Sequence, residues 1–221
     1  MKTYAIADLH GRFDLLCAAL TKITDDAAGE KARLVIMGDM IDRGPNSRGI
    51  IDLLMYPSCV PKNIELTVLQ GNHEKMLLAS VMDQSGETLR WWSGHGGHET
   101  LLSYGDVPNI KAIPVDHLEW LYRLPLYLET EGHVFVHAGI TDDSNLEDQS
   151  ADNLQWMIYP DGHVGAWRDK YVVHGHNQHA HGPMIYPKRI NLDTYAWKTG
   201  RLVIGVFGNS GPAIAQIEVM R

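Results

Sequence analysis

Residues 34–44 read LVIMGDMIDRG, a run of apolar side chains that passes directly into glycine, aspartate and arginine. Residues 34–37 have the length and composition of a buried strand, and the stretch rich in Gly, Asp and Pro after them is typical of a loop. Residues 47–55 then show the spacing of a helix. This strand, loop and helix decide the fold, because the same unit occurs again on both sides of them.

The neighbouring units follow the same plan. Residues 3–7 are apolar, run into the letters DLHG, and are followed by helical periodicity over residues 13–23. Residues 66–69 run into the letters GNHE and a helix through residues 76–81. Consecutive units of this kind predict neighbouring, largely parallel strands with helices on the faces of the sheet. Ligands of such sheets collect beyond the carboxyl ends of the strands, which is where these loops lie.

The second half of the chain has a different pattern. Short strand-like runs occur there with no long helical pattern between most of them, at residues 127–129, 133–136, 171–173, 190–192, 202–206 and 213–219. They predict a second, more antiparallel sheet packed on the first. The expected fold class is α/β, an α+β sandwich of two mixed β-sheets packed face to face with flanking helices. One domain is expected over residues 1–221, with a helical or loop excursion near the site at residues 84–119.

The composition is that of an ordinary globular protein, with 44% hydrophobic and 21% charged residues. A net charge of −8 without any cluster of Lys and Arg argues against nucleic acid as a partner. No apolar stretch approaches the roughly 20 residues that span a bilayer, and no signal-peptide pattern precedes Asp8. Two cysteines suit a reducing compartment, so we expect a cytoplasmic protein. No membrane partner is expected, and a monomer is favoured.

Polar side chains that bind metals follow five of the expected strands. Taken singly, each has an ordinary explanation, since Asp and Asn form turns or helix caps and a lone His is more often structural than a ligand. Their joint placement at one edge of a sheet makes coincidence a poor explanation. The candidate ligands are Asp8, His10, Asp39, Asn72, His137 and His176. Carboxylate, imidazole and amide donors without thiolate suit divalent ions, and we expect Mn²⁺ before Fe²⁺, Zn²⁺, Co²⁺ or Ni²⁺.

The motifs reproduce a known pattern. In chain order they read DLHG (8–11), GDMIDRG (38–44), GNHE (71–74), HAG (137–139) and GH (175–176). They resemble the serine/threonine phosphoprotein phosphatase family of the calcineurin-like metallophosphoesterases, and in length the small bacterial and phage members of the bacteriophage lambda phosphatase type. The resemblance runs from Asp8 to the C-terminal strands.

The resemblance implies roles for these residues. One metal would be held by Asp8 and His10, both metals by Asp39, and the second metal by Asn72, His137 and His176. A hydroxide that bridges the two ions would attack phosphorus directly, because two cations lower the pKa of water toward neutrality. No covalent enzyme intermediate is then expected.

The remaining roles concern the substrate. The resemblance implies that His73 protonates the leaving oxygen and that Asp42 orients its imidazole. Arg43 would bind the phosphate oxygens with its planar fork. His174, two residues before a proposed ligand, is a weaker candidate for a substrate contact. Glu74 is expected to be a helix-start residue.

The sequence also departs from the family pattern. The family often places a second phosphate-binding Arg after a Trp, and no Arg follows Trp156 in the stretch WMI. If Trp156 is that Trp, phosphate binding falls on Arg43, and Arg168 or an imidazole is a candidate for additional contacts. The surplus imidazoles are those of His95, His98, His174, His179 and His181. Trp91 and Trp92 are expected to pack in the core or at the rim; if exposed over the crevice, they would favour a nucleotide or an aromatic leaving group.

Three functions stay open at this point. Hydrolysis of phosphomonoesters, with phosphoserine or phosphothreonine in proteins as substrate, is the leading hypothesis, and a small phosphoester is the other substrate class. The alternative is symmetrical hydrolysis of dinucleoside polyphosphates such as diadenosine tetraphosphate. The scarcity of basic residues between positions 76 and 121, where only Arg90 and Lys111 occur, disfavours this alternative modestly. A catalytically quiet metal-binding scaffold is the remote alternative. Such a protein is expected to have lost some of its ligands, whereas all six candidate ligands are present here.

Overall fold

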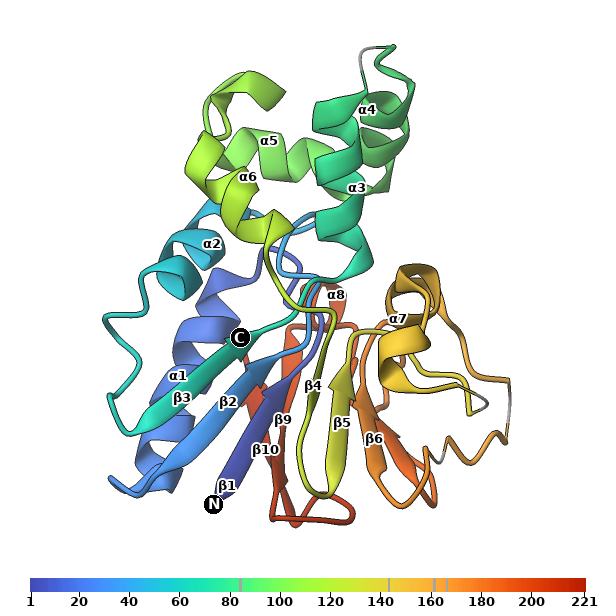
Figure 1. Ribbon diagram of the computed structural model, residues 1–221. Helices are drawn as coiled ribbons and strands as arrows, with labels where there is room; N and C mark the ends of the chain where they lie inside the picture. The colour runs from blue at the N-terminus through green and yellow to red at the C-terminus, as the bar shows by residue number, and fades with distance from the viewer. Residues whose placement is uncertain (84, 143, 161, 166) are drawn as a thin grey trace.

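Two five-stranded β-sheets face each other, and helices cover their outer sides and one end (Figure 1). The computed structural model describes residues 1–83, 85–142, 144–160, 162–165 and 167–221. The expected α/β class with two mixed sheets and flanking helices is confirmed.

The first sheet has the strand order β10-β9-β1-β2-β3. Its strands are β1 (Lys2–Ile6), β2 (Ala32–Ile36), β3 (Ile64–Val68), β9 (Arg201–Phe207) and β10 (Ala215–Met220). The three N-terminal strands are parallel, with Tyr4 paired to Leu34 and Leu34 to Leu66. They are joined by α1 (Phe13–Ala27) and α2 (Ser47–Met55), as the repeated unit predicts.

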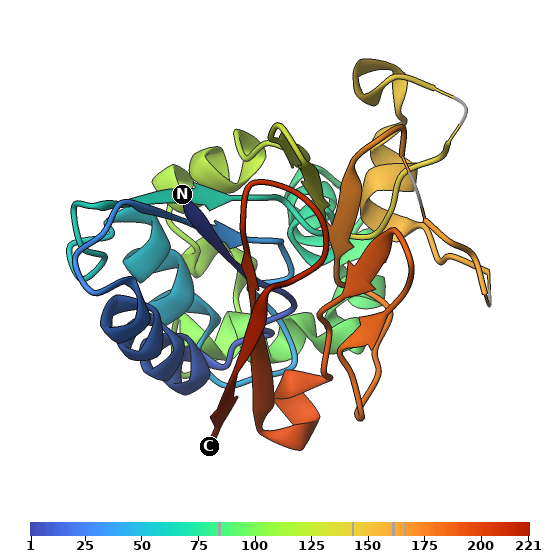
Figure 2. The same ribbon diagram turned by 90° about the horizontal axis from the view of Figure 1, so that it is seen from below.

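The C-terminal hairpin belongs to this first sheet. Strand β9 pairs antiparallel with β1, and β10 pairs antiparallel with β9. Seen from below, the two strands lie beside β1, between α1 and the second sheet (Figure 2). The placement of residues 202–206 and 213–219 in a second sheet was therefore wrong, because the hairpin returns to the free edge of β1.

The second sheet has the order β4-β5-β6-β8-β7. Its strands are β4 (Tyr127–Glu129), β5 (His133–Val136), β6 (Tyr171–His174), β7 (Met184–Ile185) and β8 (Arg189–Asn191). The pairs β5–β6 and β6–β8 are parallel, and only the edge strands β4 and β7 pair antiparallel. The expectation of a more antiparallel sheet was wrong. The β5–β6 connection is a long crossover, which parallel pairing needs, but its helix α7 (Ala151–Trp156) is too short to give a clear period.

Both faces of the first sheet are buried. Along β2 the side chains of Leu34 and Ile36 pack in the core beneath the helices, while Val35 packs in the core between the sheets with Phe135 and Val173. This alternation follows from the two-residue period of a strand. The carboxyl ends of the strands are thereby held at a fixed position between two cores.

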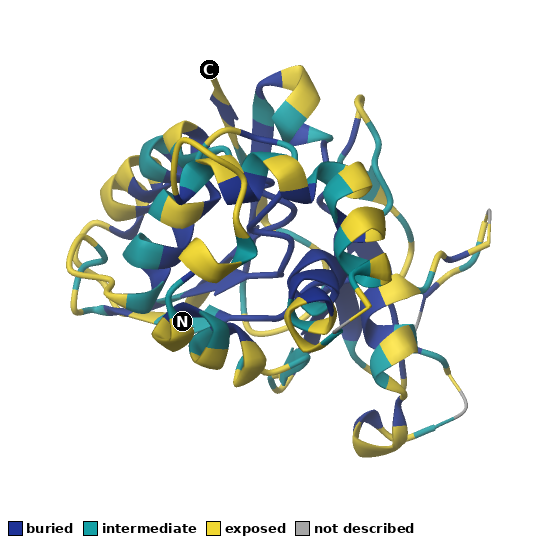
Figure 3. Cartoon of the chain, turned by 90° about the horizontal axis from the view of Figure 1, so that it is seen from above, coloured by how far each residue is buried: buried dark blue, intermediate teal, exposed yellow. Residues whose placement is uncertain are grey.

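A helical layer covers these carboxyl ends (Figure 1). It consists of α3 (Asn72–Met82), α4 (Glu87–Trp92), η1 (Ser93–Gly97), α5 (His98–Ser103), η2 (Ile110–Ala112) and α6 (Val115–Tyr122). From above, the strands and loops at the centre are buried while the helices expose their outer residues (Figure 3). Among the described residues, no helix combines the length and apolar character that a membrane crossing requires.

Candidate functional site

The loops beyond β1, β2 and β6 bend sharply toward one another. Six candidate residues have positive φ angles without being glycine: Asp8, His10, Asp39, Asp42, Arg43 and His176. Such backbone is rarely adopted by residues with a side chain, and it clusters at functional sites because the surrounding structure must hold it. The strained loops turn these side chains into a single buried crevice.

Two groups of ligand atoms lie in this crevice and share one carboxylate. His10, Asp39 and His73 form one group, and Asp39, His137 and His176 form the other, each with its ligand atoms within 4.8 Å of one another. Asp8 is buried beside them and accepts the backbone N–H of His176 at 3.0 Å. The structure therefore brings the six expected ligands together, with Asp39 between the two groups.

The donor atoms have the protonation that a cation requires. The Nδ1 atoms of His10 and His137 donate to the carbonyl oxygens of Ile41 at 2.9 Å and Met37 at 2.8 Å. Their Nε2 atoms must then carry lone pairs, and those atoms face the crevice. Burial lowers the pKa of both imidazoles and keeps them neutral.

Asn72 provides the test of whether a metal fits. Its amide oxygen lies 2.8 Å from His137 Nε2, 3.3 and 3.2 Å from the two Asp39 carboxylate oxygens, and 3.2 Å from His176 Nδ1. Without a cation, only an amide N–H₂ group could satisfy these neighbours, by donating to them. With a cation, the amide oxygen joins them as a ligand. The donor set fits a divalent ion.

Electrostatics divide the carboxylates of the crevice. Burial alone would raise the pKa of Asp39. The neighbouring imidazoles of His137, His73 and His10 lower this pKa by more than burial raises it, so the carboxylate is ionised. Burial and the charges of Asp193 and Asp39 raise the pKa of Asp8 well above its usual range. Excess negative charge at Asp8 favours a bound cation there.

His73 is held by a buried carboxylate. Its Nδ1 donates to Asp42 Oδ2 at 2.6 Å, and the same carboxylate accepts Trp92 Nε1 at 2.7 Å and Thr100 Oγ1 at 2.6 Å. Burial lowers the pKa of His73, but Asp39 and Asp42 raise it more, and the net effect is a raised pKa. The arrangement favours an imidazolium whose Nε2–H points into the crevice.

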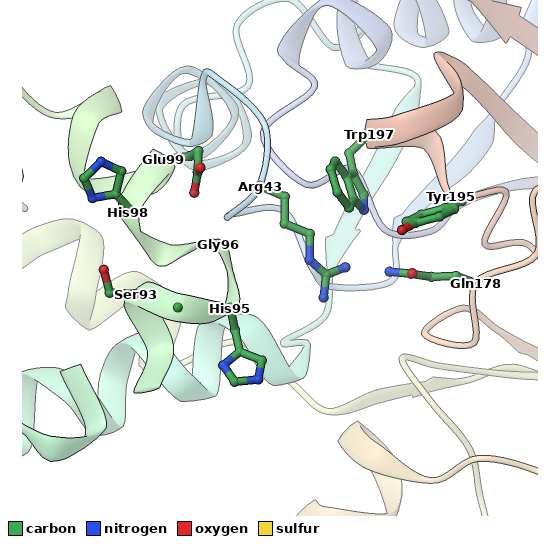
Figure 4. A pocket seen from close by; sticks show the side chains of 10 residues that line it. Arg43, Ser93, His95, Gly96, His98, Glu99, Gln178, Tyr195 and Trp197 are labelled. Atoms are coloured by element: carbon green, nitrogen blue, oxygen red, sulfur yellow. The ribbon is translucent and has the colours of Figure 1, made fainter. Parts of the chain in front are cut away.

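Arg43 spans the crevice beside the first group. Its Nη1 donates to His10 Nε2 at 2.8 Å, and its Nη2 lies 2.9 Å from His73 Nε2. Its backbone N–H donates to the carbonyl of Gly96 at 3.0 Å, and a Cβ at Gly96 would lie 2.6 Å from Arg43 Cγ. The helical layer thus holds the backbone of Arg43, and the guanidinium points into the space between His95 and Gln178 (Figure 4).

Glu74 has a role that the sequence did not reveal. Its buried carboxylate accepts the backbone N–H groups of Gly71 at 2.8 Å, Asp39 at 3.0 Å, Met40 at 2.8 Å and Ile41 at 3.3 Å. Burial, with a contribution from Asp39, raises its pKa to about 7. Besides starting α3, this side chain fixes the loop that carries Asp39, Asp42 and Arg43.

Replacing Glu74 by Gln will loosen that loop. An amide nitrogen cannot accept the N–H groups that one carboxylate oxygen now accepts, and leaving them unpaired costs about 1–3 kcal/mol for each buried group. We expect a clear fall in Tm and weaker metal binding, measured by thermal unfolding with and without added Mn²⁺. Glu119→Gln on the exposed surface of α6 is the control. Equal Tm values for both variants would contradict the role given to Glu74.

Several residues considered at the sequence level lie away from the crevice. His174 is buried, with Nδ1 near the Gly175 carbonyl at 3.0 Å and Nε2 accepting from Arg189 at 3.1 Å. Arg168 bonds to Asn145 and stacks on Trp167, so it lies at a separate cavity. His95 and His98, in contrast, line a cavity together with Arg43.

Two aromatic residues at the rim lie close to the ligand groups. Trp92 is buried, as core packing predicts, whereas Trp91 is 49% exposed. The rings of Trp91 and Trp156 are 6.3 Å apart, and the Trp156 ring lies 6.2 Å from that of His176. Their positions could not be read from the sequence, because they depend on how α4 and α7 approach each other.

The fold and the paired ligand groups define a metal-dependent phosphoesterase class. Residues 1–204 match the calcineurin-like phosphoesterase family, and the chain belongs to that family. The matched residues include every candidate ligand and all strands except β10 and the end of β9.

Relatives with different printed activities resemble the chain. Serine/threonine-protein phosphatase 1 of Salmonella typhimurium is 27% identical over 172 residues, which are 77% of this chain and 69% of that protein. A symmetrical bis(5'-nucleosyl)-tetraphosphatase of Dechloromonas aromatica is 36% identical over 141 residues, 63% of this chain and 44% of that protein. The match therefore spans less than half the length of that relative.

A solved structure agrees with the fold. The crystal structure of a candidate diadenosine tetraphosphatase superposes with a TM-score of 0.68 at 22% identity, over 99% of this chain and 93% of the other. At this identity the likeness is evidence for the fold alone.

Proposed function

We propose that this chain hydrolyses dinucleoside polyphosphates symmetrically, as a dinuclear metal-dependent phosphoesterase. Water adds to an inner phosphorus, the central P–O–P bond breaks, and a dinucleoside tetraphosphate gives two nucleoside diphosphates. The sequence favoured a phosphoprotein as the leading substrate and a dinucleoside polyphosphate as the alternative. The present proposal reverses that ranking. Among the relatives described above, the tetraphosphatase has the higher identity over its aligned part.

The observation that carries this proposal is the exposed aromatic pair beside the ligand groups. Trp156 is 37% exposed and Trp91 49% exposed, and the Trp156 ring lies between 6 and 7 Å from both the Trp91 ring (6.3 Å) and the His176 ring (6.2 Å). Aromatic faces at such a position bind nucleobases by stacking, with about 1–3 kcal/mol for each base. A phosphoserine side chain offers no ring to this surface. The pair therefore favours a nucleotide over a phosphorylated peptide.

The metals are assigned to the residues that the geometry brings together. We assign one ion to Asp8, His10 and Asp39, and the other to Asp39, Asn72, His137 and His176. When bound, two divalent ions supply Lewis acidity and make water a nucleophile near neutral pH. Mn²⁺ is proposed first, because the donors are oxygen and imidazole without thiolate.

The chain's own residues complete the reaction. Arg43 binds two non-bridging phosphate oxygens with its fork; a metal held by His10 Nε2 would leave Nη1 free for this contact. His73 donates its Nε2 proton to the leaving phosphate oxygen, and Asp42 keeps the imidazole oriented and charged. The surrounding burial excludes bulk water from this proton transfer.

Replacing Asp42 by Asn will move the alkaline limb of the kcat profile to lower pH. An acid acts only while protonated, so kcat falls as pH rises through the pKa of His73. Asp42 raises that pKa, and its loss lowers the pH at which His73 loses its proton. We also expect kcat at the optimum to fall about 10- to 100-fold, because the orienting bond is weakened. The pH profile of kcat measures both, with exposed Asp116→Asn as control; an alkaline limb that stays in place would contradict this role.

Hydrolysis of phosphoserine or phosphothreonine is the second candidate. Its support is the Salmonella phosphatase, whose match covers more of both chains than the match to the tetraphosphatase. The scarcity of Lys and Arg between positions 76 and 121 also agrees with a substrate of lower charge.

One experiment separates the candidates. Metal-stripped protein reconstituted with Mn²⁺ is given diadenosine tetraphosphate, a phosphoserine peptide, a phosphotyrosine peptide and an aryl phosphate at equal concentration, and product release is measured. The highest kcat/KM for the dinucleotide, with ADP as product, supports the proposal. Preference for the phosphoserine peptide would overturn it in favour of the second candidate. Inactivity on all four with two metals bound would indicate a binding scaffold.

A further inference from the structure

A cavity of about 450 Å³ lies beside Arg43, and the guanidinium that contacts His10 and His73 also points into it (Figure 4). One wall is formed by Tyr195 and Trp197, which flank the start of α8 (Ala196–Thr199). The turn at Ser93–Gly97 forms the opposite wall, and Gln178 lies between. Because Arg43 belongs both to this cavity and to the crevice, a group held here is adjacent to a phosphate held there.

The aromatic wall is fixed by its own packing. The rings of Tyr195 and Trp197 meet edge to face at 5.3 Å, and the Arg43 guanidinium carbon lies 5.7 Å from the centre of the Trp197 ring. Tyr195 has a φ of 60°, a conformation in which a non-glycine residue needs support from its surroundings. Its backbone N–H donates to Asp193 Oδ1 at 2.8 Å, which provides that support. The wall is therefore built in advance and does not need a ligand to form.

The same wall carries a polar group without a partner. The indole Nε1 of Trp197 is buried and has no acceptor among the residues that the structure describes. Buried N–H groups are nearly always paired, so the Trp197 ring has to turn to offer this donor to an acceptor in the cavity. Gln178 adds an amide that can both donate and accept. A nucleobase has a ring face that can stack on this wall and edge atoms that can pair with the Gln178 amide.

The two aromatic surfaces of the site lie at different ligand groups. Trp156 is next to His176, whereas Trp197 is next to Arg43, which contacts His10 and His73 of the other group. A substrate cleaved at its centre has one nucleoside on each side of the reacting phosphates. The arrangement of aromatic surfaces matches this symmetry.

We propose that the cavity lined by Tyr195, Trp197 and Gln178 binds one nucleobase of the substrate, while the Trp91–Trp156 pair accommodates the other. This inference rests on the proposed cleavage of dinucleoside polyphosphates and names the residues that select the nucleoside. Trp197 is the specificity-determining side chain, because its ring forms the cavity wall beside Arg43.

The test compares ligands with and without a base. ADP and inorganic pyrophosphate are used as inhibitors of aryl phosphate hydrolysis by the Mn²⁺-loaded enzyme, and the inhibition constant of each is measured for wild type, Trp197→Ala and Trp197→Phe. We expect Trp197→Ala to raise the constant for ADP by about tenfold relative to that for pyrophosphate, and Trp197→Phe to restore most of the loss. Tyr122→Ala, which removes a 72% exposed aromatic side chain from α6, is the matched control.

The outcomes separate the inference from the function on which it rests. If the ratio of the two constants is unchanged in Trp197→Ala, or if both constants rise equally, the cavity does not hold a base and Trp197 acts only by supporting Arg43. If wild type prefers the phosphoserine peptide over diadenosine tetraphosphate, the proposed function fails, whatever the inhibition constants are. A selective loss of ADP binding together with dinucleotide hydrolysis supports both.

Discussion

Asp39→Asn will remove both metals and abolish phosphoester hydrolysis. Asp39 belongs to both ligand groups, and its ionised carboxylate is the negative charge that four imidazoles surround. Asn keeps the shape but removes this charge, so neither ion retains its shared ligand. The lost Lewis acidity is worth several kcal/mol in the transition state, which at about 1.4 kcal/mol for each tenfold corresponds to a fall of about 10³-fold or more in kcat.

Elemental analysis after dialysis measures the metal content, and phosphate release measures turnover. Exposed Asp106→Asn, in the helical layer, is the matched control and should keep two metals and full activity. Circular dichroism establishes that Asp39→Asn is folded. A folded variant with two bound metals and wild-type turnover would exclude the shared role of Asp39.

His73→Ala will lower kcat strongly while both metals stay bound. A positioned general acid contributes about 10²–10⁴-fold, and His73 has the raised pKa and the buried partner that this role needs. The loss should be largest for alkyl phosphates, whose leaving group needs a proton, and smallest for nitrophenyl phosphate, whose leaving group does not. The ratio of kcat values for the two substrates is the measurement, and exposed His181→Ala is the control.

The same variant decides between two roles that the geometry allows. His73 Nε2 lies 3.9 Å from Asp39 Oδ2, inside one of the two groups of candidate ligands. If His73→Ala loses one metal equivalent, His73 is a ligand and the general acid must be sought elsewhere. If two metals remain and the leaving-group dependence steepens, the acid role holds.

The parallel half of the fold could be predicted because its units are long and periodic. Residues 47–55 coincide with α2, and the apolar runs of the first three strands end where the candidate ligands begin. The second sheet was harder, since strands of three or four residues carry no period that distinguishes parallel from antiparallel pairing. The return of β9 to β1 is a matter of tertiary packing and leaves no mark in local sequence.

The candidate ligands could be predicted, because their residue types bind metals and each follows the end of an expected strand. What stayed hidden are partners that are distant in sequence: Asp42 is bonded by Trp92 and Thr100, 50 and 58 positions away. Glu74 looked like a helix start, and only the fold reveals the N–H groups from another loop that it accepts. The cavity lined by Tyr195, Trp197 and Gln178 also depends on the approach of residues 93–97 to α8, which no motif encodes.

The carbonyl of Gly96 holds the backbone of Arg43, and the turn that contains Gly96 is also a wall of the cavity. Under the proposed function, recognition and turnover are therefore coupled through a single short turn. A base that fills the cavity would press on the same backbone that positions Arg43 for the phosphate, so a well-fitting substrate would improve its own alignment for attack. Directed evolution of this turn toward new substrates should consequently change kcat together with KM, and variants that change KM alone should map to residues outside it.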